Sequence, residues 1–214
     1  MKPIEEQRRR HIIDSTMRVL ARDGPAGTSL SRIAREAKVS KGIICYYFDN
    51  KDGLFDAVLT SVRERLAAAA IAEALLPEDA WQQISAFIVA HLTYVRRHRT
   101  EILALRHLAS TRAGGTDMSD HLAVWSDQRD WLARALAEGQ ECGAFKAFDV
   151  TVAATAISGA LENGLLRWAH DPAIDLEAYA QQLLALFEGG VRDLRPEPTN
   201  SLQGMEADGL SCRI

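Results

Sequence analysis

Cysteine is scarce in this chain of 214 residues. The three cysteines, Cys45, Cys142 and Cys212, are far apart and include no CxxC pair. This spacing suggests neither a disulfide framework nor a zinc knuckle, so we expect free thiols. The sequence also lacks a run of eighteen uncharged apolar residues, and its first residues lack the apolar block of a signal peptide. We therefore expect a soluble, cytoplasmic protein.

The signatures of common catalytic sites are missing as well. The six histidines form no HExxH motif, no serine or cysteine lies in a GxSxG frame, and neither GxGxxG nor GxxxxGK[ST] occurs. Each of these motifs places a nucleophile, a metal or a phosphate in a defined geometry, so their absence argues against an enzyme. We expect no catalytic residue, no cofactor and no metal site.

What the chain has instead is an uneven distribution of charge. Residues 1–51 contain eleven Lys and Arg against six Asp and Glu, a net charge of +5, whereas the remaining residues carry −9. A basic N-terminal part followed by an acidic body is typical of a protein that contacts an anion with one part only. Chance clustering of solvated charges is the alternative. Since 47% of the residues are hydrophobic, the chain can bury a real core.

Apolar residues recur at helical spacing along most of the chain, and no segment shows the sustained alternation of a strand. Gly and Pro interrupt the pattern, while Ser40 and Asn50 offer helix caps. The tail at 195–214 has no apolar periodicity, so we expect it to be disordered. The pattern predicts an all-α fold of about nine helices, near residues 4–20, 30–37, 41–48, 51–75, 79–98, 100–112, 118–140, 149–169 and 175–194.

The second and third predicted helices are joined by Lys38 and Val39. Ala34 is small where the second of these helices would cross the first, Val39 fills the turn, and Ser40 caps the following helix. This spacing predicts a helix-turn-helix at about residues 29–48, whose second helix can lie in a major groove of DNA. A helical protein-interaction module without DNA binding is the alternative, because any small helical hairpin can show this spacing.

A series of residues around this segment has the order and spacing of a known motif: Gly24, Thr28, Ser29, Leu30, Ile33, Ala34, Ala37, Val39, Ser40, Gly42, Tyr47, Phe48, Lys51 and Leu54. It resembles the TetR family of bacterial transcriptional regulators, whose pattern reads roughly T-x-x-x-I-A-x-x-A-G-V-S-x-G-x-x-Y-x-x-F-x-x-K-x-x-L. The usual turn glycine is Lys38 here, which a positive φ would strain by about 1 kcal/mol. The usual tyrosine of the recognition helix is Cys45, and this run looks closer to the BetI-like branch.

The resemblance implies a helix-turn-helix DNA-binding domain at 1–50 and a helical effector-binding and dimerisation domain at 51–194. Hydroxyls and free amides at a helix N-terminus suit a phosphate, Lys51 would reach another phosphate, and Lys41 suits a guanine or a phosphate. Caps and packing are the plain alternatives for these side chains. The expected DNA-binding residues are Thr28, Ser29, Ser40, Lys41, Gly42, Tyr46, Tyr47 and Lys51.

The last two helices have broad apolar faces with many small residues, which favours a homodimer held by a four-helix bundle. The expected interface residues are Ile157, Ala160, Leu161, Leu183, Leu184 and Phe187. In the family the small-molecule effector lies inside the helical body, and the candidate pocket residues are His91, Tyr94, His107, Trp125, Glu162 and Asn163, with ordinary core roles as the alternative. The prediction is a ligand-responsive repressor that binds a pseudo-palindromic operator in double-stranded DNA as a homodimer.

Overall fold

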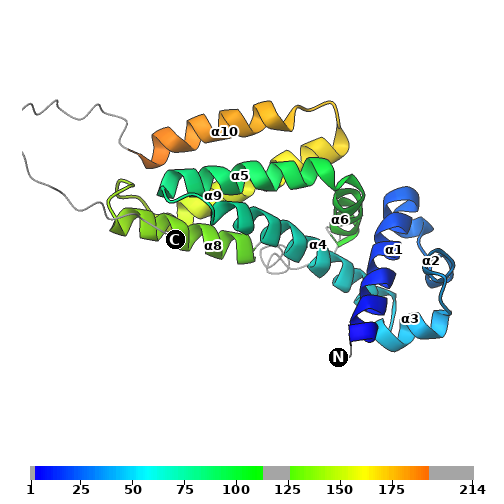
Figure 1. Cartoon of the computed structure of the whole chain (residues 1–214). Helices are drawn as coiled ribbons and strands as arrows, with labels where there is room; N and C mark the ends of the chain where they lie inside the picture. Colours follow the sequence, from blue (N-terminus) through cyan, green and yellow to red (C-terminus); the bar gives the residue numbers. More distant parts are fainter. Residues whose placement is uncertain (1–2, 113–125, 193–214) are drawn as a thin grey trace, which may run out of the picture. The chain divides into compact units, whose positions relative to one another are not determined.

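The computed structural model describes residues 3–112 and 126–192, which form helices and contain no strand (Figure 1). The predicted all-α fold is confirmed, and the helix bounds agree with the predicted ones to within a few residues. The expected helix at 118–140 begins at Ser126 within the described residues, while Trp125 and the tail 195–214 lie outside them. The helices are α1 (Pro3–Gly27), α2 (Leu30–Ala37), α3 (Lys41–Phe48), α4 (Lys51–Ala74), α5 (Ala80–Arg97), α6 (Arg99–Arg112), α8 (Ser126–Glu141), α9 (Val150–His170) and α10 (Leu176–Val191).

Packing divides the described residues into two compact units. Unit 1 consists of residues 3–66, 95–112 and 165–172, and unit 2 of residues 67–94, 126–164 and 173–192. The boundaries between the two units follow the packing contacts and cut through several helices. The expected functional division at residue 50 therefore stays a prediction.

Helix α1 is the centre of unit 1, where it packs against α2 and α6, and α2 in turn packs against α3. Its amphipathic face is buried as the spacing predicted, through Ile12, Ile13, Thr16, Val19 and Leu20. The helix breaks at Gly24 (φ 65°, ψ 176°), a conformation open to glycine because it has no Cβ. Pro25 then begins a last short turn, a position that suits its fixed φ and missing N–H.

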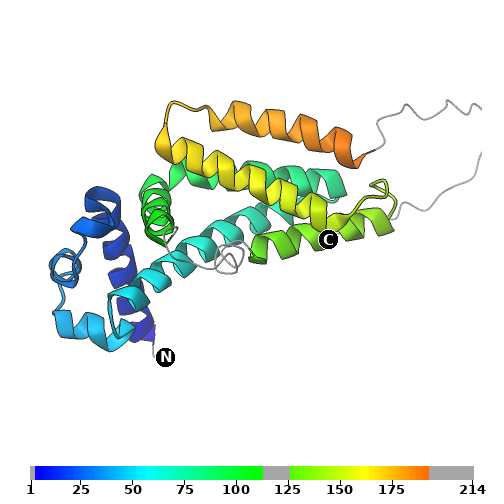
Figure 2. The same cartoon turned by 180° about the vertical axis from the view of Figure 1, so that it is seen from behind.

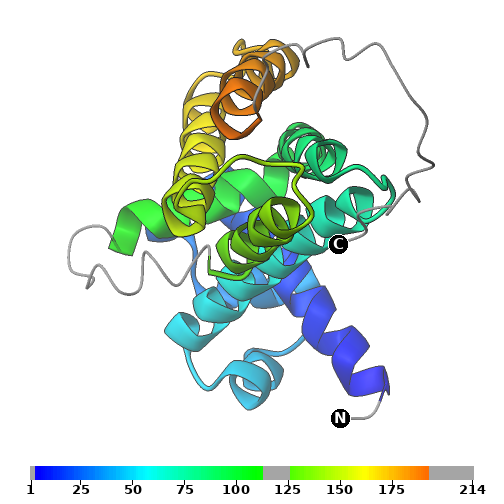
Figure 3. The same cartoon turned by 90° about the vertical axis from the view of Figure 1, so that its left-hand side faces the viewer.

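Unit 2 is a set of packed helices, of which α5 and α8 are seen nearly end-on in Figure 3. The rings of Phe87 on α5 and Trp131 on α8 stack with their centroids 4.8 Å apart. Helices α9 and α10 run antiparallel and side by side (Figures 1 and 2). They approach closely at Gly164, where an added Cβ would lie 2.6 Å from the ring of Tyr179. The Tyr179 hydroxyl donates a 2.7 Å hydrogen bond to the Ala160 carbonyl, which fixes the ring there.

Two further findings bear on the expectations from sequence. None of the described helices is both long enough and apolar enough to cross a membrane. Cys142 is disulfide-bonded, which corrects the expectation of a free thiol at that residue, whereas Cys45 is free.

Candidate nucleic-acid interface

Both helices of the predicted helix-turn-helix begin with a serine cap. The Ser29 hydroxyl accepts a 3.3 Å hydrogen bond from the backbone amide of Arg32, and the Ser40 hydroxyl accepts one of the same length from Ile43. These bonds satisfy one of the amides that a helix leaves unpaired at its start. The remaining amides of the first turns of α2 and α3, and both exposed serines, are available to an anion.

Helix α3 is held by one face and presents the other. Ile44 and Phe48 are buried, while Lys41, Gly42 and Tyr46 are exposed, Tyr46 to 76%. An exposed tyrosine on a short helix leaves apolar ring surface in water, which is informative because most such side chains find cover. The arrangement is that of a helix fixed in place by two apolar anchors, with a polar and aromatic outer face.

The side chain of Tyr47 lies between these two faces. Its ring is half-buried and meets that of Tyr46 edge to face, with the centroids 5.1 Å apart. The ring of Phe48 is tilted against it at 6.3 Å. Tyr47 therefore packs and remains partly accessible at the same time, and its contact with the DNA backbone stays a prediction.

The turn between α2 and α3 has a left-handed residue at its start. Lys38 has φ 54° and ψ 41°, so the strain that the sequence suggested at this position is present. The amides of Lys38 and Val39 donate to the carbonyls of Arg35 and Ala34, at 3.3 Å and 3.0 Å, which closes the end of α2. Residues without a glycine's freedom adopt this conformation only where the surrounding hydrogen bonds enforce it.

Thr28 and Lys51 are both tied to the break in α1. The Thr28 hydroxyl donates a 2.6 Å hydrogen bond to the Gly24 carbonyl, and the residue is only 1% exposed. A contact of Thr28 with DNA would require that bond to be exchanged, so Ser29 is the more accessible of the two hydroxyls. The ammonium group of Lys51 donates to the Pro25 carbonyl at 3.3 Å and lies 5.1 Å from the ring centroid of Phe55.

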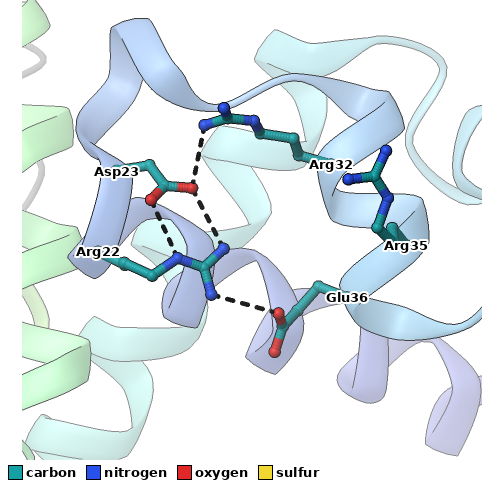
Figure 4. A pocket seen from close by; sticks show the side chains of 5 residues that line it. All are labelled: Arg22, Asp23, Arg32, Arg35 and Glu36. Carbon is teal, nitrogen blue, oxygen red and sulfur yellow. Dashed lines mark hydrogen bonds and ion pairs between the residues drawn. The ribbon is translucent and has the colours of Figure 1, made fainter.

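An ion-pair network joins α1 to α2 beside this surface (Figure 4). Arg22 donates to both carboxylate oxygens of Asp23, at 3.0 and 3.2 Å, and lies 3.6 Å from Glu36. Arg32 reaches Asp23 at 3.2 Å and Arg18 reaches Glu36 at 2.9 Å. The side chains of Arg22, Asp23, Arg32, Arg35 and Glu36 line a surface hollow of about 350 Å³.

The network shifts the ionisation of its members. The hydrogen bond from Arg22 lowers the pKa of Asp23, and the hydrogen bond from Arg18 lowers the pKa of Glu36. The hydrogen bond to Asp23 raises the pKa of Arg22 in turn. All three groups therefore stay charged across the physiological range, and most of the arginines here are neutralised by a neighbour.

Comparison with known proteins identifies this part of the chain. Residues 12–58 match the model of a family described as "Bacterial regulatory proteins, tetR family". This segment, residues 12–58, is therefore of the TetR type. A curated relative, the HTH-type transcriptional regulator BetI of Burkholderia thailandensis, is 30% identical over 123 residues, which are 58% of this chain and 55% of the relative. The chain thus matches only about half the length of this relative.

Solved TetR-like structures match the fold over most of the chain. A putative transcriptional regulator from Pseudomonas aeruginosa PAO1 is 27% identical with a TM-score of 0.73, covering 88% of this chain and 91% of that one. FadR from Bacillus subtilis, in complex with stearoyl-CoA, is 22% identical with a TM-score of 0.73, covering 86% of this chain and 99% of that one. At 22% identity, the similarity to FadR shows only that the two proteins share a fold.

Several contacts within unit 1 had no signal in the sequence. Arg65 of α4 donates to Asp14 of α1 at 2.7 Å and lies 3.4 Å from Glu101 of α6. These residues are far apart in the chain, so no local spacing could pair them. The network around Asp23 was missed for the same reason, although the arginines themselves contributed to the net charge that pointed to an anion.

The candidate effector residues are dispersed through the fold. His91 and Tyr94 are buried on α5 in unit 2, and burial lowers the pKa of His91 to about 4, although a hydrogen bond with Gln128 acts in the opposite direction. Glu162 and Asn163 are neighbours on α9 in the same unit, where Glu162 is half-buried and Asn163 is exposed. His107 lies on α6 in unit 1, where burial lowers its pKa, and Trp125 is outside the described residues. The five described residues fall in both units, and their role in an effector pocket stays a prediction.

The candidate interface residues fall into two groups. Ile157, Leu161 and Leu183 are buried within the chain itself, whereas Ala160, Leu184 and Phe187 are half-buried. The outer faces of α9 and α10 carry other apolar side chains, among them Val152 at 64%, Leu166 at 38% and Leu186 at 69% exposure. The apolar pattern that suggested an interface is therefore shared between the core and an exposed face.

Proposed function

We propose that this protein is a transcriptional regulator that binds a pseudo-palindromic operator as a homodimer and is released by a small-molecule effector. The observation that carries the proposal is α3, anchored by Ile44 and Phe48 and presenting Lys41, Gly42 and Tyr46 on a surface flanked by serine-capped amides. This outer face fits a major groove, in which a lysine meets guanine or phosphate and a close glycine lets the helix approach. Such a regulator acts in the cytoplasm, where the bacterial chromosome lies.

The homodimer would use the exposed face of α9 and α10. Val152 of α9 and Leu186 of α10 are exposed to solvent, and small residues such as Ala156 and Gly159 on α9 permit close approach. Apolar side chains gathered on a helix pair mark an interface more often than a solvated surface. A symmetric dimer would place two recognition helices on successive half-sites of the operator.

The effector is proposed to bind within the helices of unit 2 through an uncharged, mainly apolar portion. Among the described residues of unit 2 the buried polar side chains are Gln83, His91 and Gln128, and none is a carboxylate, lysine or arginine. With its pKa near 4, His91 is neutral at pH 7. A buried charged group on a ligand would lack a counter-charge there and would be costly to desolvate. The acyl chain of stearoyl-CoA, the ligand in the FadR structure, is an uncharged, apolar group of this kind.

A titration of the full chain with DNA from upstream of its own gene tests the regulator. Fluorescence anisotropy with a shuffled duplex as competitor should reveal specific binding, stronger by at least about 10³-fold. Tyr46→Ala should abolish most of this preference without changing the helix content, because the ring is exposed. Leu76→Ala, at a leucine of similar exposure on another surface, is the matched control and should bind like the wild type.

A helical protein-interaction module is the other candidate, and the same titration separates the two. That module would bind specific and shuffled duplexes equally weakly, and Tyr46→Ala would then have no effect on DNA. Release of the bound operator by fatty acyl compounds, compared with choline and betaine, tests the effector class. Release by these two quaternary ammonium compounds alone would contradict an apolar effector.

A further inference from the structure

The turn between α2 and α3 carries three cations that form no ion pair with the described residues. Arg35 lies in the last turn of α2, Lys38 follows the helix directly, and Lys41 is the first residue of α3. All three are exposed, and none has an ion pair or side-chain hydrogen bond with the described residues. They differ in this from Arg22 and Arg32, which carboxylates hold in place.

Lys38 stands out among them because its residue type conflicts with its backbone. At φ 54° a glycine would carry no strain, yet the chain has a long charged side chain there. A cation near a helix C-terminus interacts favourably with the helix dipole, and this would explain Arg35. The dipole effect gives no reason for a lysine at the strained position itself, since the neighbouring Arg35 already supplies the charge.

We infer that Lys38, together with Arg35, binds a phosphate of the operator backbone beside the contact made by Lys41. This rests on the proposed function. The three residues follow one another at intervals of three along the chain, from the last turn of α2 across the turn to the start of the recognition helix. Phosphate contacts of this kind fix the position of a protein on the duplex and carry no base preference. The strain at Lys38 is a backbone cost at a functional site.

The decisive variant is Lys38→Gly, because it has opposite expected effects on folding and on binding. Glycine relieves the strained φ, so the melting temperature of the free protein should rise. Loss of one phosphate contact should weaken binding of all duplexes alike and reduce the slope of log K against log salt by about 0.9 per recognition helix. When the salt concentration rises from 50 to 200 mM, the ratio of the wild-type affinity to the Lys38→Gly affinity should fall by about 3.5-fold per recognition helix.

Three further variants isolate the charge. Lys38→Arg should bind nearly as tightly as the wild type. Lys38→Gln should reduce the slope of log K against log salt as Lys38→Gly does, while the strained φ at this position remains. Arg35→Gln should also reduce this slope. Arg134→Gln is the matched control, because Arg134 is an exposed arginine of α8 without a partner among the described residues. It should leave the slope unchanged. If Lys38→Gly folds poorly, Lys38→Gln carries the test alone.

The outcomes distinguish this inference from the proposed function. A wild-type protein that shows no specific DNA binding overturns the proposed function, and the inference with it. A wild type that binds its operator while Lys38→Gly and Lys38→Gln keep the full affinity and salt slope overturns the inference only. A loss confined to the specific duplex would assign Lys38 to a base and would likewise contradict a phosphate contact.

Discussion

Placing a carboxylate at Leu186 should split the proposed dimer while leaving each protomer folded. Leu186 is 69% exposed on α10, so a glutamate there remains solvated in the isolated chain. In a dimer packed through α9 and α10 the same carboxylate would be desolvated without a partner. Leu186 is a better site for this test than Ala160 or Leu184, because both of these are half-buried in the protomer and a charge there would also disturb folding.

The size of the effect follows from burial. Each leucine lost from an interface removes about 1.5–3 kcal/mol of apolar burial, and a two-fold axis counts it twice, giving about 3–6 kcal/mol. The desolvated carboxylates add several kcal/mol per ion. Since about 1.4 kcal/mol corresponds to a tenfold change, the dimer should weaken by at least about 10²-fold and by far more if both terms act. Operator affinity should then fall by about 10² to 10⁴, the advantage that linkage of two recognition helices provides.

Analytical ultracentrifugation and DNA titration of the full chain measure both consequences. Leu186→Gln shows how much of the loss is packing rather than charge, and Leu76→Glu places a carboxylate at a leucine of similar exposure at the end of α4. Leu76→Glu should stay dimeric and bind normally. A monomeric wild type, or a monomeric Leu186→Glu that keeps the full operator affinity, would refute the reasoning.

Three other predictions concern contacts described above. Lys51→Ala should weaken binding of all duplexes alike and lower the salt slope by about one per recognition helix, and a changed sequence preference would contradict a phosphate role. Gly164→Ala should destabilise the chain by about 1–3 kcal/mol in denaturant unfolding, because its Cβ meets the ring of Tyr179, and no loss would contradict that close approach. The unfolded chain takes up a proton at His91 below pH 6.5 and the folded chain only near pH 4, so stability should fall as the pH drops through this window, by up to roughly 3 kcal/mol. His91→Gln should flatten that part of the stability profile, and an unchanged profile would show that other groups cause it.

The sequence predicted local features well because their causes are local. Helical spacing located the buried face of α1, and the caps Ser29, Ser40 and Asn50 were recognisable from residue type and position alone; all three accept the expected amide hydrogen bonds. A positive φ could be considered at Lys38 because this residue stands where the motif that the chain resembles has its turn glycine. These features need only a few neighbouring residues.

Features that depend on distant residues could not be predicted. The Arg65–Asp14 ion pair joins residues 51 positions apart, and the sequence does not say which of many charges will meet. The apolar residues of α9 and α10 posed the same difficulty, because periodicity marks a helix face without saying what covers it. Ile157 and Leu183 proved to be covered by the chain itself, while Leu186 is exposed.

The hydrogen bond between Lys51 and Pro25 has a consequence for the entropy of the proposed DNA binding. A free lysine side chain loses about 1.5–2 kcal/mol of rotamer freedom when a ligand orders it. In Lys51 the carbonyl of Pro25 and the ring of Phe55 already restrict the ammonium group. Much of that ordering therefore occurs during folding, and a phosphate that approaches Lys51 meets a preorganised cation. An exposed arginine such as Arg8, near the start of α1, offers the same charge with its ordering still to come.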